Sequence, residues 1–178
     1  SPGLAASWPQ PLHVLVVMEG DETLPSTVIE KTHQGIQGFL DQSPSYVALN
    51  RDAAQLRLGQ APSKIPEFCA ENQRCWSQVV DRAKVDILMH ISVGFSGSRE
   101  QAWIQLYNSE SALQTQTVST VLPRGGGAPL ESLEELFHGQ ASIEVELEPG
   151  STRLQVNGRS KLLRPAPRVR LRGMPPGR

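Results

Sequence analysis

The stretch from Phe68 to Thr120 constrains the fold of this chain more than any other part. It begins with two cysteines, Cys69 and Cys75, and continues through a segment with helical periodicity. Two strand-like runs follow, DILMHISVGFSGSRE and QAWIQLYNSESALQTQTVSTV. This order predicts a helix followed by a β-hairpin. The stretch therefore indicates a domain in which helices pack on a sheet.

The two cysteines bear on the cellular compartment. They are the only cysteines in the chain, which is the minimum for one disulfide. Residues six apart in a regular helix are too distant to be bridged, so a disulfide requires Cys69 in the loop before the helix and Cys75 in its first turn. The alternative is a pair of reduced thiols, one of them in the core. The spacing argues against a zinc site, and a disulfide indicates an oxidising compartment.

The length of 178 residues fits one domain, or one domain with a small appendage. The longest apolar run, LHVLVVM, is far shorter than the roughly 20 residues that span a bilayer. Residues 1–11 are predicted to be a flexible lead-in, and they lack the basic and apolar regions of a signal peptide. We therefore expect either a trimmed mature form or a cytosolic protein.

Hydrophobic periodicity predicts the remaining elements. The predicted N-terminal elements are a buried strand at 13–19, a helix from Pro25 to about Asp41, a strand at 46–49, a helical turn or two and then a loop with Pro62 and Pro66 over 50–67, and a helix capped by Asn72. The predicted later elements are strands at 86–95 and 102–109 joined by a turn at 94–98, a continuation or third antiparallel strand at 113–122, a glycine-rich linker at 124–128, and a helix from Pro129 to a C-cap at Gly139. Alternating strands follow, with a hairpin at Asn157-Gly158.

The predicted fold is an α/β (α+β) sandwich over residues 12–139, with helices packed on a mixed sheet. A small β module or tail is predicted over 140–178.

Motifs for catalysis or cofactor binding are scarce. Gly125–Gly127 lacks the lysine of a phosphate-binding loop, so a linker is the better interpretation. The VGFSGS segment around Ser96 matches the nucleophile elbow only in part, because Ser98 replaces the last glycine and a hairpin turn is predicted there. A hydrolase built around Ser96 is therefore a weak alternative. We expect no catalytic residue, no metal ligand and no cofactor.

Charge is unevenly distributed along the chain. Eight basic residues and no acidic ones lie between Ser151 and Arg178, while the first 150 residues carry nine basic against eighteen acidic, a net −9. The candidate partner-binding residues are Arg164, Arg168, Arg170 and Arg172. They suit an anionic polymer, although no aromatic residue lies among them for base stacking, so nucleic acid is a poor candidate. The alternative is that Arg168, Arg170 and Arg172 form the exposed face of a strand. The row Glu144, Glu146 and Glu148 is most simply the solvent side of a half-buried sheet, and it would also suit pairing with this basic tail or that of another molecule.

Residues 141–178 resemble a PEGA-type module, a small β domain of bacterial and archaeal surface proteins. The pieces IEVELEPGSTRLQVNGR and LRPAPRVRLRGMPPG follow its order of strands, Pro-Gly and Asn-Gly turns, and a Pro-bearing loop. Such a module would continue beyond this point, so we expect either a truncated module or a tail that pairs elsewhere.

The preceding part resembles the α/β domain that comes before PEGA modules in myxobacterial envelope proteins, and is similar to the N-terminal domain of the Tol-system protein TolB. The matching pieces are LHVLVVM, CAENQRCWSQVVDRAKVD and ILMHISVGFSGSREQAWIQLYNSESALQTQ. Lys84-Val85-Asp86 stands where the family has a glycine-rich segment. The resemblance implies a non-enzymatic protein-interaction or assembly module that contacts other envelope proteins. It also implies a periplasmic or outer-membrane-associated location, with any signal peptide or lipobox absent from this chain.

Overall fold

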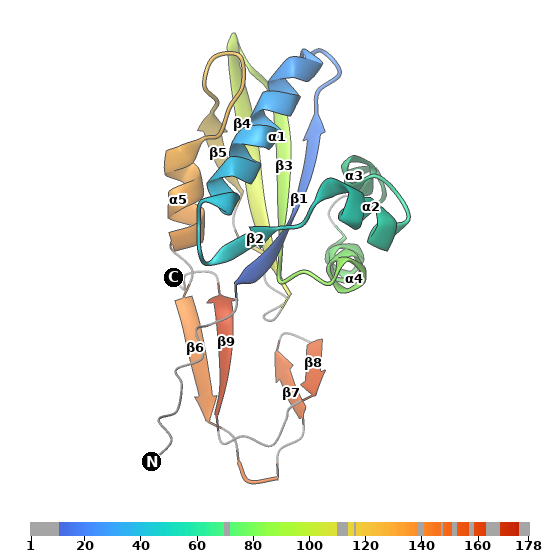
Figure 1. The fold of residues 1–178 in the computed structure, drawn as a ribbon, viewed down its shortest axis with the longest axis vertical. Helices are drawn as coiled ribbons and strands as arrows, with labels where there is room; N and C mark the ends of the chain where they lie inside the picture. Colours follow the sequence, from blue (N-terminus) through green and yellow to red (C-terminus); the bar gives the residue numbers. More distant parts are fainter. Residues whose placement is uncertain are drawn as a thin grey trace.

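The computed structural model describes residues 11–69, 72–109, 114, 115, 117–138, 141–146, 148–150, 153–156, 159–162 and 168–174 (Figure 1). Side chains are described through Phe137, and beyond it at Glu146, at 148–150 and at Arg153. In chain order the elements are β1 (Leu12–Gly20), α1 (Ser26–Asp41), β2 (Tyr46–Ala48), α2 (Arg51–Leu58), the 3-10 helix η1 (Pro62–Lys64), α3 (Ile65–Cys69), α4 (Gln73–Ala83), β3 (Ile87–Ser96), β4 (Arg99–Asn108), β5 (Val118–Val121), α5 (Leu130–His138), β6 (Ala141–Glu146), β7 (Arg153–Val156), β8 (Arg159–Leu162) and β9 (Arg168–Met174).

The first five strands form one mixed sheet in the order β2-β1-β3-β4-β5. β1 is parallel to both β2 and β3, while β4 is antiparallel to β3 and to β5. The mixed sheet with packed helices confirms the predicted fold class. Segment 113–122, for which two interpretations were open, forms a third antiparallel strand over Val118–Val121.

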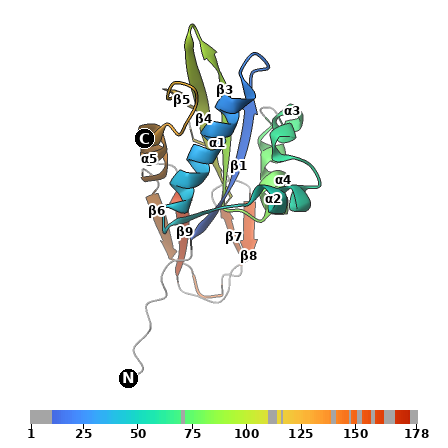
Figure 2. The same ribbon diagram turned by 45° about the horizontal axis from the view of Figure 1, so that its top comes forward.

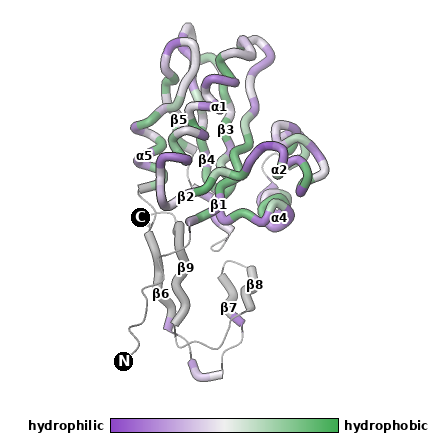
Figure 3. Tube along the Cα trace, viewed as in Figure 1, coloured by the Kyte–Doolittle hydropathy of each residue, from purple (hydrophilic) through white to green (hydrophobic). Residues whose placement is uncertain are grey.

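Helices cover both faces of this sheet (Figures 1 and 2). α1 and α5 cover the first face, on which alternate residues of β1, β3 and β4 form a continuous apolar core with Ile36, Leu40 and Leu133. The set Ile87, Met89, Ile91 and Val93 of β3 points to this face. Hydrophobic residues follow the central strands (Figure 3). Burial of this kind is the main stabilising term of the fold.

The second face is covered over part of its length only. α2, α3 and α4 pack through Leu58, Ile65, Trp76 and Val80 on a smaller apolar cluster. In Figure 1 the β3–β4 hairpin extends beyond these helices. Within the part of the chain that the structure describes, no helix covers the portion of this face nearer the hairpin (the uncovered half-face), and the candidate site lies there.

The glycine-rich segment is a docked loop, so its interpretation as a linker was wrong. A Cβ on Gly126 would lie 2.5 Å from the carbonyl oxygen of Val28, and a Cβ on Gly35 would lie 2.7 Å from the backbone nitrogen of Ala128. Side chains at these positions would separate the loop from α1. The glycines thus serve close backbone packing.

Two other boundaries differ from the prediction. Pro66 lies within α3, because proline is tolerated in the first turn of a helix, where its missing N–H is not needed. β3 runs through Ser96, so Gly94 belongs to the strand and the turn is formed by Gly97 and Ser98. The proposed C-cap at Gly139 and the lead-in at 1–10 lie outside the described residues.

The C-terminal strands form two antiparallel pairs, β6 with β9 and β7 with β8. Val156 is in register with Arg159, and this pairing confirms the predicted hairpin. Its turn residues, Asn157 and Gly158, lie outside the described residues. The division into domains at residue 139 and the truncated module remain predictions.

Candidate functional site

The cysteines form a disulfide at one border of the uncovered half-face. Cys69 ends α3, Cys75 lies in the first turn of α4, and their Cα atoms are 5.2 Å apart. Cys69 was expected in a loop. The break between the two helices brings the cysteines within bridging distance, whereas one regular helix would hold them too far apart. Asn72 caps α4 as predicted, because its side-chain oxygen accepts hydrogen bonds from the backbone N–H groups of Arg74 and Cys75.

The strand register defines three rows of side chains on the second face. The rows are Leu15, Leu88 and Tyr107; then Val17, His90 and Gln105; then Glu19, Ser92 and Trp103. The first row is buried under the helices, and the third is only partly buried. The face therefore changes from apolar to polar and aromatic where the helical cover ends.

This change opens a groove of about 490 Å³. Its lining residues are Glu19, Pro66, Trp76, His90, Ser92, Trp103, Gln105, Gln114 and Thr117. The floor comes from β1, β3 and β4, one wall from α3 and α4, and the other wall from the segment before β5. Its size is within the range of small-ligand and peptide-side-chain sites.

Trp103 is the principal aromatic side chain of the groove floor. A Cβ on Gly94 would lie 3.2 Å from Cζ3 of Trp103. The absence of a side chain at Gly94 therefore lets the indole lie against the sheet. The glycine that resembled part of a nucleophile elbow has this packing role.

His90 links the groove floor to its helical wall. Its Nε2 lies 3.0 Å from Oε1 of Glu19, and its ring lies 5.0 Å from that of Trp76, between centroids. The Glu19 side chain is 38% exposed and that of His90 24%. These contacts hold the Glu19 carboxylate at the rim of the groove.

Asp21 lies next to Gly94, just beyond the row of Glu19. Its backbone N–H donates to the carbonyl of Val93 at 2.9 Å, and its Cβ is 4.0 Å from the position of a Cβ on Gly94. Hydrogen bonds from the backbone N–H and then the hydroxyl of Thr23 lower the pKa of Asp21. Both carboxylates, Glu19 and Asp21, thus lie on the β1 side of Trp103.

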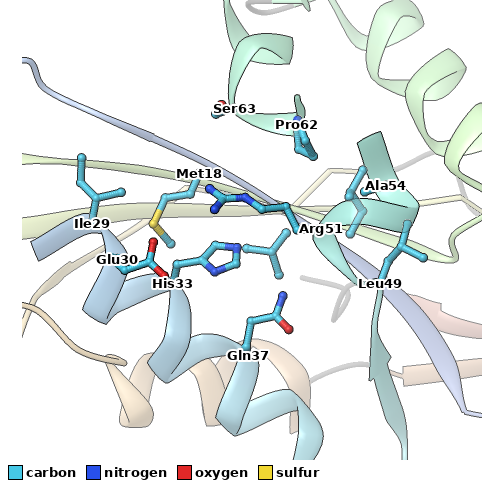
Figure 4. A pocket seen from close by; sticks show the side chains of 12 residues that line it. Met18, Ile29, Glu30, His33, Gln37, Leu49, Arg51, Ala54, Pro62 and Ser63 are labelled. Atoms are coloured by element: carbon cyan, nitrogen blue, oxygen red, sulfur yellow. The ribbon is translucent and has the colours of Figure 1, made fainter. Parts of the chain in front are cut away.

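A second, smaller cleft of about 90 Å³ lies at the edge of β1, between α1 and α2 (Figure 4). Figure 4 shows His33 of α1 and Arg51 of α2 side by side in it, with Glu30 nearby. Burial and then the charge of Arg51 lower the pKa of His33, and Glu30 opposes this shift.

The side chains of the arginines proposed from the sequence lie outside the described part of the chain. Arg168, Arg170 and Arg172 belong to β9, and Arg164 lies outside the described residues. Arg168 is in register with Glu146, and Arg170 with Glu144. Ser96 ends β3 at an exposed hairpin turn, whereas a nucleophile elbow joins a strand to a helix.

Among the residues that the structure describes, no cluster of three His, Cys, Asp or Glu side chains has the geometry to hold a metal ion. In the same part of the chain, no helix combines the length and apolar character of a membrane span.

No protein-family model matches this chain, and no curated protein matches it in sequence. Solved structures with partial similarity include the C-terminal domain of LpoB from Escherichia coli, with a TM-score of 0.46 and 10% identity over 67% of this chain and 87% of that one. Lipoprotein GNA1162 from Neisseria meningitidis gives a TM-score of 0.46 and 13% identity over 69% and 90% of the two chains. TolB from Acinetobacter baumannii gives a TM-score of 0.44 and 12% identity over 81% of this chain and 34% of that one. None of these comparisons supports the PEGA-type resemblance or a myxobacterial source.

The sequence did not identify the groove as a site. Its floor combines residues from three strands that are brought together only by the register. One signal was present: Glu19, His90 and Ser92 interrupt the apolar runs of β1 and β3, and Trp103 and Gln105 lie on one face of β4.

Proposed function

We propose that this chain is a non-catalytic module of the cell envelope, periplasmic or outer-membrane-associated, whose groove holds a segment of another envelope protein. The observation that carries the proposal is the open half of the second sheet face. There a groove of about 490 Å³ presents Trp103 among polar side chains. Aromatic residues beside polar groups are characteristic of protein-binding surfaces.

The disulfide supports the location. Disulfides form and persist in oxidising compartments, including the bacterial periplasm and cell surfaces. Cys69 is 1% exposed, so the bond is protected from solvent and has a structural position. A catalytic or redox-active cysteine is expected to be accessible instead.

Site-specific photo-crosslinking in the native cell tests the proposal. A photoreactive residue replaces the exposed Thr117 in the groove wall, and a control replaces the exposed Glu134 on α5, on the other side of the sheet. We expect the same envelope protein to be attached repeatedly from position 117 and not from position 134. Equal attachment from both positions, or none from position 117, would contradict the proposal.

The arginines of the C-terminal strands carry the alternative, binding of an anionic polymer. Their surplus of positive charge favours it, and the in-register glutamates of β6 weigh against it because opposite charges at opposed positions stabilise a strand pair. Binding to heparin that weakens with salt and disappears on deletion of residues 151–178 would support this alternative. Unchanged binding after the deletion would exclude it.

A further inference from the structure

We infer that the groove receives an arginine or lysine side chain of the partner segment, held over the indole of Trp103 with the carboxylates of Glu19 and Asp21 on one side. The inference rests on the proposed function, since it names the chemistry of the segment that the groove binds.

Trp103 provides the surface for the cation. Its ring packs toward Gly94 while the side chain still lines the groove and is partly exposed. A cation within about 6 Å of an aromatic centroid is attracted by the electron-rich face, and tryptophan is the strongest of the aromatic residues in this respect. A neutral aliphatic side chain would gain only contact area from the same indole.

The two carboxylates provide the matching charge. Oε1 of Glu19 is engaged by His90 at 3.0 Å, and within the described residues Oε2 of Glu19 has no hydrogen-bond partner. Asp21 follows two residues later in the chain and lies next to Gly94, against which the Trp103 ring packs. Carboxylate oxygens accept charge-assisted hydrogen bonds from arginine and lysine, which are roughly twice as strong as neutral ones.

Among the described residues that line the groove, none is a lysine or arginine that could neutralise these carboxylates. Arg99 lies at the tip of the β3–β4 hairpin, four residues from Trp103 along β4, which corresponds to about 13 Å of extended strand. Ser92, Gln114 and Thr117 add uncharged hydrogen-bonding groups suited to a peptide backbone. The charge pattern thus favours a basic segment over an acidic one.

Peptide binding to the intact chain tests the inference. The probe is acetyl-Gly-Arg-Gly-Arg-Gly-amide, and its control carries citrulline, which is uncharged, in place of both arginines. Binding is followed by the NMR shift of the Trp103 indole N–H. We expect the arginine peptide to shift this resonance with at least about fivefold higher affinity than the citrulline peptide, which corresponds to about 1 kcal/mol.

Two variants assign the effect to the groove. Glu19→Gln is expected to reduce the affinity for the arginine peptide about fivefold, whereas Glu134→Gln makes the same charge change on α5 and is expected to leave it unchanged. The affinity of the wild type should fall with added salt. Trp103→Leu lacks the indole N–H, so its binding is followed by calorimetry, and it should also bind more weakly than the wild type. If Trp103→Leu does not fold, Glu19→Gln still tests the inference.

Equal affinity for the two peptides, or equal affinity of Glu19→Gln and wild type, would overturn the inference. So would tighter binding of a neutral oligosaccharide such as chitotriose at Trp103. Crosslinking from position 117 separates the two proposals. If crosslinking persists at the wild-type level in Glu19→Gln, the proposed function stands and a basic side chain in the groove is excluded. If the wild type gives no crosslinking from position 117, the proposed function itself fails.

Discussion

The hydroxyl group of Thr32 in α1 accepts a hydrogen bond from the backbone N–H of Gly127 at 3.1 Å. The same hydroxyl donates to the carbonyl of Val28 at 2.8 Å. Thr32 is completely buried, so its bond to Val28 is shielded from water, and its bond from Gly127 is partly buried. This pair fixes the loop before α5 to the helix that covers the first sheet face.

Replacement of Thr32 by valine should destabilise the fold by about 1–3 kcal/mol. Valine has nearly the same shape, but it leaves the N–H of Gly127 without its acceptor. The free energy of unfolding from urea denaturation measures the effect. Thr32→Ser keeps the hydroxyl and should recover much of the loss; equal stability of the valine variant and the wild type would contradict the role of this bond.

The two glycines of α1 should respond in opposite ways to alanine. Gly35→Ala places a Cβ 2.7 Å from the backbone nitrogen of Ala128, so the loop must move, at a cost of about 1–3 kcal/mol. Gly38 has no atom within 4 Å of the added Cβ, and Gly38→Ala should stabilise the helix by up to about 1 kcal/mol. Thermal unfolding of both variants in parallel measures the difference. A destabilised Gly38→Ala would show that the packing at this position is misunderstood.

The pH dependence of stability should contain a contribution from His33. Burial, then the charge of Arg51, lowers the pKa of His33 in the folded chain, while an unfolded histidine titrates near about 6.5. As pH falls through this value, the unfolded state takes up the proton first, so stability is lost on acidification and is fully present above it. Urea denaturation between about pH 7.5 and 5.5 measures this loss.

His33→Gln should remove this part of the pH dependence. Arg51→Gln should reduce it, because the positive charge that opposes protonation is gone. NMR titration of the His33 ring gives the folded pKa directly. A ring that titrates at or above the ordinary histidine value would contradict the expected direction.

Local sequence patterns were sufficient to predict most helices and strands, but not the tertiary contacts between them. The helix that forms α1, the strands β3 and β4, and the Asn72 cap depend on neighbours within one segment, and each formed as predicted. The docking of the glycine-rich loop on α1 depends on Val28 and Gly35, almost 100 residues earlier in the chain. No local signal distinguishes such a loop from a linker, because glycine suits both.

The groove was missed for a related reason. Glu19, His90 and Trp103 are adjacent only through a parallel and an antiparallel pairing that fix the register of three strands. The extent of the helical cover decided which half of the face stayed open. That extent depends on where α3 ends and α4 begins, and the segment containing α3 was predicted to be a loop.

The disulfide should be formed in protein purified without reductant. Cys69 and Cys75 close a short loop, and constraint of the unfolded chain by such a loop contributes about 2 kcal/mol. Intact mass after alkylation in denaturant, with and without prior reduction, reports the bond. Only the reduced sample should take up two alkyl groups, and uptake without reduction would count against both the bond and an oxidising compartment. The double variant Cys69→Ser and Cys75→Ser should lose at least this much stability, because the serine hydroxyl at position 69 would be buried in the apolar cluster formed by α3, α4 and the sheet.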